Sequence, residues 1–174
     1  MRLPGYLHTV AAIAGISPES MAVRDRELVR AGLRESTRGK RSDVPTLAEH
    51  LMVIFAGLSD AATSRIAADV SDWMNLPLRD SPFPLPEGRL IDLLPVVIRQ
   101  IASREIDAPR PELIVNYARR EVTFVVGKEQ SVWFSHNAPL SIQGAERIAL
   151  LNPRVVARIV AFYREVIAPN EAAD

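Results

Sequence analysis

The chain has 174 residues, which suffices for one domain or two small ones. With 48% hydrophobic and 24% charged residues it can bury a core, and its lack of cysteine excludes disulfide frameworks, thiolate metal sites and cysteine nucleophiles. The formal net charge is zero and no apolar run reaches the length of a membrane span, so we expect a cytoplasmic protein without membrane contact.

The first 75 residues contain apolar positions at helical spacing and predict four helices. These are expected over Leu7–Ala14, from Ser17 to about Ala31, after Thr46, and from Ser59 or Asp60 onward. Ser17 is a favoured N-cap residue, and Pro18 suits the first helical position because its missing amide has no intrahelical partner there. Gly32 is a typical residue just beyond a helix end.

Four prolines lie in residues 76–88 and predict an extended linker, because proline lacks a backbone donor and disfavours helix before it. Residues 89–105 then predict a helix that Pro95 breaks or kinks. Three β-rich segments, residues 112–118, 121–127 and 131–136, predict a small antiparallel meander. Helices over Ser141–Leu151 and Pro153–Ile167 are expected to close the chain, the second capped by Asn152.

These elements predict a mainly α protein with a small antiparallel β-meander, which is an α+β fold. The expected organisation is a helical domain over residues 1–75, a proline-rich linker over 76–88, and an α+β domain over 89–174. We expect the last of these to dimerise or to contact a partner protein.

Charge is concentrated in one short stretch of this neutral chain. Residues 24–41 contain seven basic and three acidic side chains, a local net charge of +4. A basic patch on a neutral protein indicates that one face binds a negatively charged partner.

A short pattern precedes this basic stretch: Ala11, three residues, Gly15, then Ile16 and Ser17, with Met21 six residues after the glycine. A glycine at such a junction accepts positive φ, and a small residue before it lets two helices approach closely. The pattern resembles the helix-turn-helix family of bacterial and phage DNA-binding proteins, although Pro18 and Met21 depart from its commonest form. The sequence LVRAGL, followed by a basic loop, also resembles the winged branch of that family.

The resemblance implies that residues 17–31 form a recognition helix and that the loop at residues 34–41 touches the DNA backbone. Arg24 is expected to make a bidentate contact with guanine, and the loop arginines and lysine to contact phosphates or the minor groove. The candidate DNA-binding residues are Ser17, Ser20, Val23, Arg24, Glu27, Arg30, Arg34, Arg38, Lys40 and Arg41.

The predicted function is therefore a sequence-specific transcriptional regulator of phage or prophage type, associated with the nucleoid. It is expected to bind double-stranded DNA as a homodimer and to contact a protein of the transcription machinery. Two alternatives stay open: a DNA-packaging protein of the small-terminase kind, and a protein-interaction adaptor. His8, His50 and His136 do not share metal-ligand spacing, and we expect no catalytic site, metal or cofactor.

Overall fold

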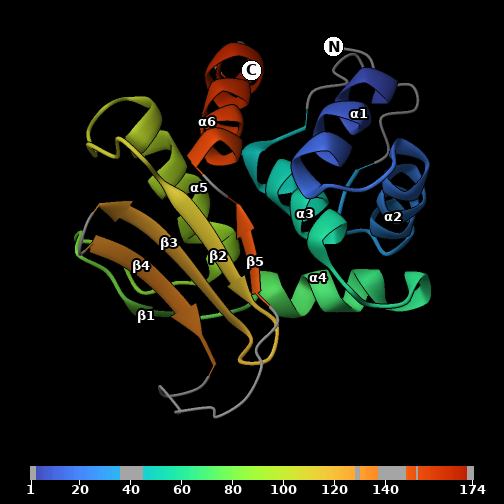
Figure 1. Ribbon diagram of the computed structural model, residues 1–174, viewed down its shortest axis with the longest axis horizontal. Coiled ribbons are helices and arrows are strands. Elements are labelled where there is room, and N and C mark those ends of the chain that lie inside the picture. Colours follow the sequence, from blue (N-terminus) through green and yellow to red (C-terminus); the bar gives the residue numbers. More distant parts are fainter. Residues whose placement is uncertain (1–2, 36–44, 128–129, 137–147, 152, 172–174) are drawn as a thin grey trace. The chain divides into compact units, whose positions relative to one another are not determined.

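The computed structural model describes residues 3–35, 45–127, 130–136, 148–151 and 153–171 (Figure 1). Its helices and its antiparallel sheet confirm the predicted α+β fold. The chain divides into two compact units, the first formed by residues 1–74 and 162–174, the second by residues 75–161. The second unit is thus an insertion in the sequence of the first, whereas the sequence predicted two consecutive domains.

The first unit is helical, and α1, α2 and α3 form one group in it (Figure 1). Its elements up to residue 74 are α1 (Leu3–Ala14), α2 (Pro18–Arg30), α3 (Leu47–Leu58), the 3-10 helix η1 (Thr63–Arg65) and α4 (Ile66–Met74). The predicted start of the fourth helix at Ser59 or Asp60 is wrong. The Ser59 hydroxyl accepts the amide of Ala61 at 3.1 Å and donates to the Asp69 carboxylate at 2.5 Å, which holds a turn there instead.

The end of the chain returns to this unit. Helix α6 (Pro153–Phe162) begins in the second unit and continues through a π-helical turn, η2 (Tyr163–Ile167), into α7 (Ala168–Glu171). This confirms the helix predicted over Pro153–Ile167, while its expected cap Asn152 lies outside the described residues. The ring of Phe162 stacks on His50, with 4.5 Å between ring centroids, so the last helical segment contributes to the core of the first unit.

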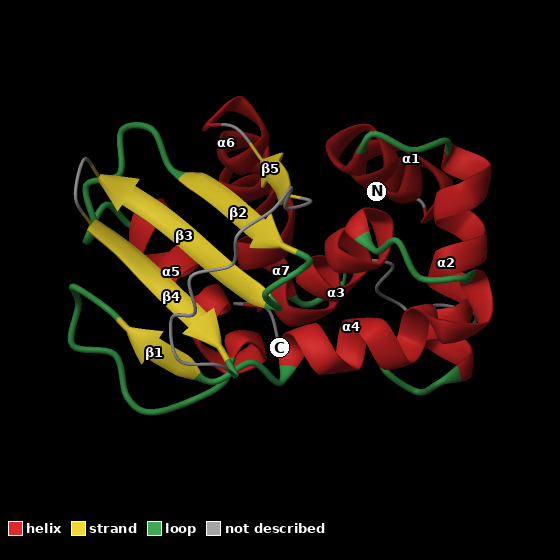
Figure 2. Cartoon of the chain, turned by 60° about the horizontal axis from the view of Figure 1, so that its bottom comes forward, coloured by secondary structure: helices red, strands yellow, loops and turns green. Residues whose placement is uncertain are grey.

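The second unit contains a five-stranded antiparallel sheet in the order β1-β4-β3-β2-β5 (Figure 2). The strands are β1 (Leu78–Asp80), β2 (Glu112–Asn116), β3 (Glu121–Gly127), β4 (Gln130–Ser135) and β5 (Ile148–Leu151). Strands β2, β3 and β4 are consecutive neighbours, which confirms the predicted meander.

Strand β5 replaces part of a predicted helix. The helix expected over Ser141–Leu151 is wrong for its last four residues, because Ile148 pairs with Asn116 and Leu151 pairs with Leu113 of β2. Residues 141–147 lie outside the described residues. A short apolar run fits a helix or a strand, and pairing with a distant neighbour decides between them.

One face of the sheet is apolar, with Val122, Phe124 and Val126 alternating inward along β3. Helix α5 (Leu90–Ala102) lies against a face of the sheet in both views (Figures 1 and 2). Of the predicted break or kink at Pro95, the break is absent: Pro95 is buried inside the helix, which continues to Ala102. The helix loses the one hydrogen bond that a residue-95 amide would donate, and the burial of seven of its side chains offsets that cost.

The proline-rich residues 76–88 form part of the second unit, although we expected a linker. Leu78 pairs with Phe134 of β4, and the Leu78 amide donates to the Gly88 carbonyl at 2.9 Å. A further bridge joins Pro77 to Arg89. The prolines therefore lie in a loop whose two ends are hydrogen-bonded together. None of the helices in the described part of the chain has both the length and the apolar character needed to cross a bilayer.

Candidate nucleic-acid interface

A tight turn joins α1 to α2 as the sequence pattern predicted. Gly15 has φ +70°, and the Ile16 amide donates to the Ala11 carbonyl at 3.1 Å, which closes the end of α1. Ser17 follows in extended conformation, and its hydroxyl accepts the Ser20 amide at 3.2 Å as the N-cap of α2. Three residues thus end one helix and begin the next.

Close packing against α3 supports this turn. A Cβ atom added at Gly57 of α3 would lie 2.5 Å from Cβ of Ala14, so only glycine permits this approach. Met21 and Leu28 of α2 are completely buried. The α1–turn–α2 segment is therefore held on a common apolar core.

The other end of α2 is equally well defined. Gly32 has φ +72°, its amide donates to the Val29 carbonyl at 3.1 Å, and the Leu33 amide donates to the Leu28 carbonyl at 3.0 Å. This pair of bonds satisfies carbonyls that have no partner inside the helix. The predicted role of Gly32 as the residue beyond the helix end is confirmed.

Arg24 makes contacts other than those we expected. Its Nη1 donates to the carbonyl oxygens of Ala56 at 2.6 Å and Ser59 at 2.8 Å, at the C-terminal end of α3. A cation is favourable there because the last carbonyls of a helix carry partial negative charge. Arg24 therefore has an internal role that the assignment to guanine did not include: the residue is half-buried, and its Nη1 joins α2 to the end of α3.

The remaining candidates on α2 differ in exposure. Ser17 and Ser20 are exposed, and the hydroxyl of Ser17 donates to that of Ser20 at 3.2 Å. Val23 and Glu27 are half-buried. The Arg30 side chain is 76% exposed and pairs with Glu27 at 2.9 Å, a surface ion pair of small energetic weight.

Arg26 is an exposed basic residue that the sequence analysis did not select. It precedes Arg30 by four residues, so the two guanidinium groups lie on one side of α2. No ion pair of Arg26 is found among the described residues. The exposed face of α2 therefore carries Arg26 and Arg30, whereas the sequence analysis placed Arg24 on that face. The sequence analysis did not anticipate that Asp25, which lies between Arg24 and Arg26, is buried.

Arg34 was expected to contact phosphate, and this expectation is corrected. Only 3% of Arg34 is exposed, and its Nη1 forms an ion pair with the buried carboxylate of Asp25. Its Cζ lies 5.7 Å from the ring centroid of Tyr6, a cation–π arrangement. Burial raises the pKa of Asp25 even though the charge of Arg34 and its hydrogen bond act in the opposite direction.

Arg34 and Asp25 belong to a larger buried polar cluster that the sequence analysis missed. The Tyr6 hydroxyl and Nδ1 of His50 are 3.1 Å apart, and both residues are completely buried. Burial lowers the pKa of His50 to about 3 and raises the pKa of Tyr6, so both side chains are neutral at pH 7. This cluster connects α1, α2 and α3, and Phe162 covers the rings of Tyr6 and His50.

Three of the candidate residues, Arg38, Lys40 and Arg41, lie outside the described residues. Within the described ranges, no three histidine, aspartate or glutamate side chains are grouped so that they could hold a metal ion. No protein-family model, curated protein or solved structure matches this chain.

Proposed function

We propose that the first unit binds double-stranded DNA and that the protein acts as a transcriptional regulator in the cytoplasm, associated with the nucleoid. The observation that carries the proposal is the α1–turn–α2 arrangement, with Gly15 at positive φ and Ser17 as N-cap, together with the exposed pair Arg26 and Arg30. Exposed arginines one helical turn apart suit phosphate or base-edge contacts along a groove.

The internal roles of Arg24 and Arg34 refine which residues would touch DNA. Both guanidinium groups hold the first unit together, so we assign the contacts to Arg26 and Arg30, with Ser17 and Ser20 exposed at the N-terminal end of the same helix. Glu19 is also exposed there. Backbone and Ser17 hydrogen bonds lower the pKa of the Glu19 side chain, which keeps it ionised and opposes close approach of a phosphate.

Fluorescence anisotropy with a labelled short duplex at low salt tests the proposal. The double variant Arg26→Glu, Arg30→Glu should bind at least about tenfold more weakly, because it replaces two cations by anions. Arg110→Glu is the control: Arg110 is exposed in the second unit, and its replacement makes the same charge change for each residue replaced, which is half the total change of the double variant. Equal affinities of the double variant and the wild type, or equal losses in both variants, would remove the proposal.

We further propose a homodimer, since one small helical module reads only a few base pairs and a dimer reads two half-sites. Light scattering should then give twice the chain mass of 19.2 kDa. A much larger ring would favour the packaging alternative. An adaptor would keep its activity in the double variant that does not bind DNA.

A further inference from the structure

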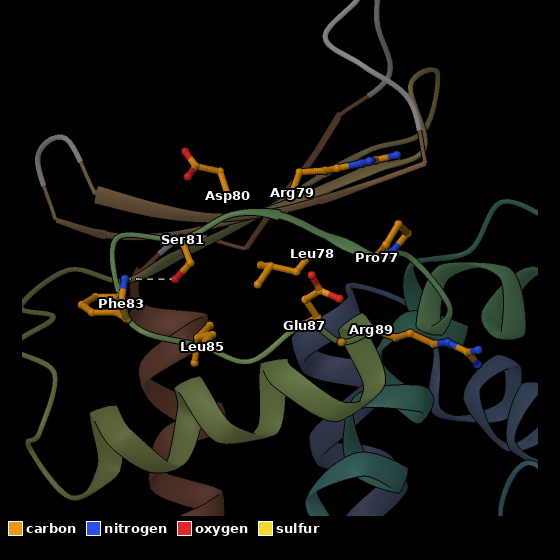
Figure 3. Close-up of a pocket in the computed structure, with 10 residues that line it drawn as sticks. Pro77, Leu78, Arg79, Asp80, Ser81, Phe83, Leu85, Glu87 and Arg89 are labelled. Atoms are coloured by element: carbon orange, nitrogen blue, oxygen red, sulfur yellow. Dashed lines mark hydrogen bonds between the residues drawn. The ribbon is translucent and has the colours of Figure 1, made fainter.

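The proline-rich loop of the second unit borders an open cavity of about 650 Å³ (Figure 3). All the residues that line it lie between Pro77 and Arg89. Ligand cavities in proteins have volumes of roughly 300–1,000 Å³ and combine apolar walls with a few polar groups. The size of this cavity therefore suits a ligand larger than a few water molecules.

Local contacts hold the loop in shape. Its two ends are joined by the hydrogen bond from the Leu78 amide to the Gly88 carbonyl, and the Ser81 hydroxyl accepts the Phe83 amide at 3.1 Å. A Cβ atom added at Gly88 would lie 3.0 Å from Cγ of Leu93, so this end of the loop rests directly on α5. Prolines at three loop positions fix φ, so little ordering is required when a ligand enters.

The lining of the cavity is mixed: three apolar side chains lie in it together with the exposed carboxylate of Glu87. Leu78, Phe83 and Leu85 line it and are half-buried. Figure 3 shows Leu78 and Glu87 between β1 and α5, and no ion pair of Glu87 is found among the described residues. The site therefore offers an aliphatic surface next to a negative charge.

The two arginines at the cavity do not neutralise this charge. Arg79 donates to the carbonyl oxygens of Ser135 at 2.6 Å and His136 at 2.5 Å, and Arg89 donates to Asn75 at 2.8 Å. In Figure 3 both side chains extend away from Glu87. Asp80 also lines the cavity, but in Figure 3 its carboxylate projects from the opposite side of β1.

We propose that this cavity binds a lysine or arginine side chain presented by an extended peptide segment of a partner protein. The aliphatic stem of a basic side chain matches Leu78, Phe83 and Leu85, and its charged end matches Glu87. The volume exceeds that of one such side chain, so it also accommodates flanking peptide groups. The ligand class differs from the polyanion proposed for the first unit, and the two proposals stand or fall separately.

The test is an NMR titration of the full chain with a capped alanine peptide that carries one central lysine. Amide signals of residues 78–89 should shift, and replacing the lysine by norleucine should weaken binding at least about fivefold, since norleucine keeps the stem and loses the charge. Glu87→Gln should cause a similar loss. Asp107→Asn is the control, because Asp107 is an exposed carboxylate of the second unit that does not line the cavity, and it should leave affinity within about twofold of the wild type.

Three outcomes would overturn the proposal. One is the absence of shifts in residues 78–89, and another is a Glu87→Gln variant that binds the lysine peptide as well as the wild type does. The third is binding of free butylammonium as tightly as the lysine peptide, which would show that the peptide groups contribute nothing to binding.

Discussion

Arg34 and Asp25 form an ion pair in the interior of the first unit, with 2.5 Å between Nη1 and Oδ1. The pair fixes the chain just beyond α2 to the helix itself. Nε and Nη2 of Arg34 are buried and have no hydrogen-bond partner among the described residues, so the guanidinium is only partly satisfied. A buried pair of this kind adds little net stability over apolar side chains, but removal of one partner leaves the other charge unpaired.

Removing one member of this pair should destabilise the first unit strongly. Asp25→Leu alone or Arg34→Met alone is expected to lower the free energy of unfolding by about 3–5 kcal/mol, measured by urea denaturation. The double variant Asp25→Leu, Arg34→Met should recover most of this loss because no buried charge remains. Arg30→Met, which breaks only the exposed pair with Glu27, is the control and should change stability by less than about 0.5 kcal/mol. Additive losses in the double variant would contradict this account.

The pH dependence of stability should report on His50. Its pKa in the folded chain is about 3, below the ordinary value of 6.5, so the unfolded chain binds the proton more tightly. The free energy of unfolding should therefore fall as pH decreases from about 6.5 towards 3, by at most about 5 kcal/mol for this group.

His50→Gln isolates the contribution of His50, because Asp25 titrates nearby in both proteins. The raised pKa of Asp25 acts in the opposite sense, since the folded state then takes up a proton more readily on acidification. The difference in unfolding free energy between wild type and His50→Gln should shrink steadily as pH decreases through this window. A difference independent of pH would show that His50 is accessible to protons in the folded chain.

Arg24 should matter for stability and little for DNA affinity. Arg24→Met keeps much of the aliphatic side chain but removes the donors to Ala56 and Ser59, and should cost about 2 kcal/mol. Thermal unfolding measures this loss, with Arg26→Met as the exposed control. At a temperature where Arg24→Met is folded, its DNA affinity should stay within about twofold of the wild type. A selective loss of affinity without a loss of stability would restore Arg24 as a DNA contact.

Phe162 should be needed for the stability of the first unit although it follows the second unit in sequence. Phe162 is 8% exposed, and its ring contacts those of Tyr6 and His50. Phe162→Ala is expected to cost about 3–5 kcal/mol in urea denaturation. Leu150→Ala, at a side chain that is 56% exposed, should cost less than about 1 kcal/mol. If the fragment 1–75 unfolds at the same urea concentration as the full chain, this role of Phe162 is excluded.

Local signals in the sequence predicted both ends of α2 and the turn before it, but not the starts of α1 and α4. The roles of Ser17, Gly15 and Gly32 can be predicted from the sequence, because each depends on backbone geometry set by the immediate neighbours. The β-meander was equally legible from alternation along β3.

Contacts between residues distant in the chain could not be predicted from the sequence. The pairing of Ile148–Leu151 with β2, the closure of the proline-rich loop, and the return of Phe162 to the first unit all join residues distant in sequence. The sequence also could not predict which arginines are internal and which are exposed. Sequence assigns Arg24 and Arg34 the same charge as Arg26 and Arg30, and only the fold distinguishes internal from exposed guanidinium groups.

The salt dependence of duplex binding tests the proposed function most directly. The logarithm of the wild-type association constant should fall steeply and linearly with the logarithm of salt concentration, corresponding to about five or more displaced counterions. The double variant Arg26→Glu, Arg30→Glu should have a shallower slope by about two, one for each lost phosphate contact, and Arg110→Glu should keep the wild-type slope. A flat salt response of the wild type, or no duplex bound at low salt, would contradict the proposal that the first unit binds DNA.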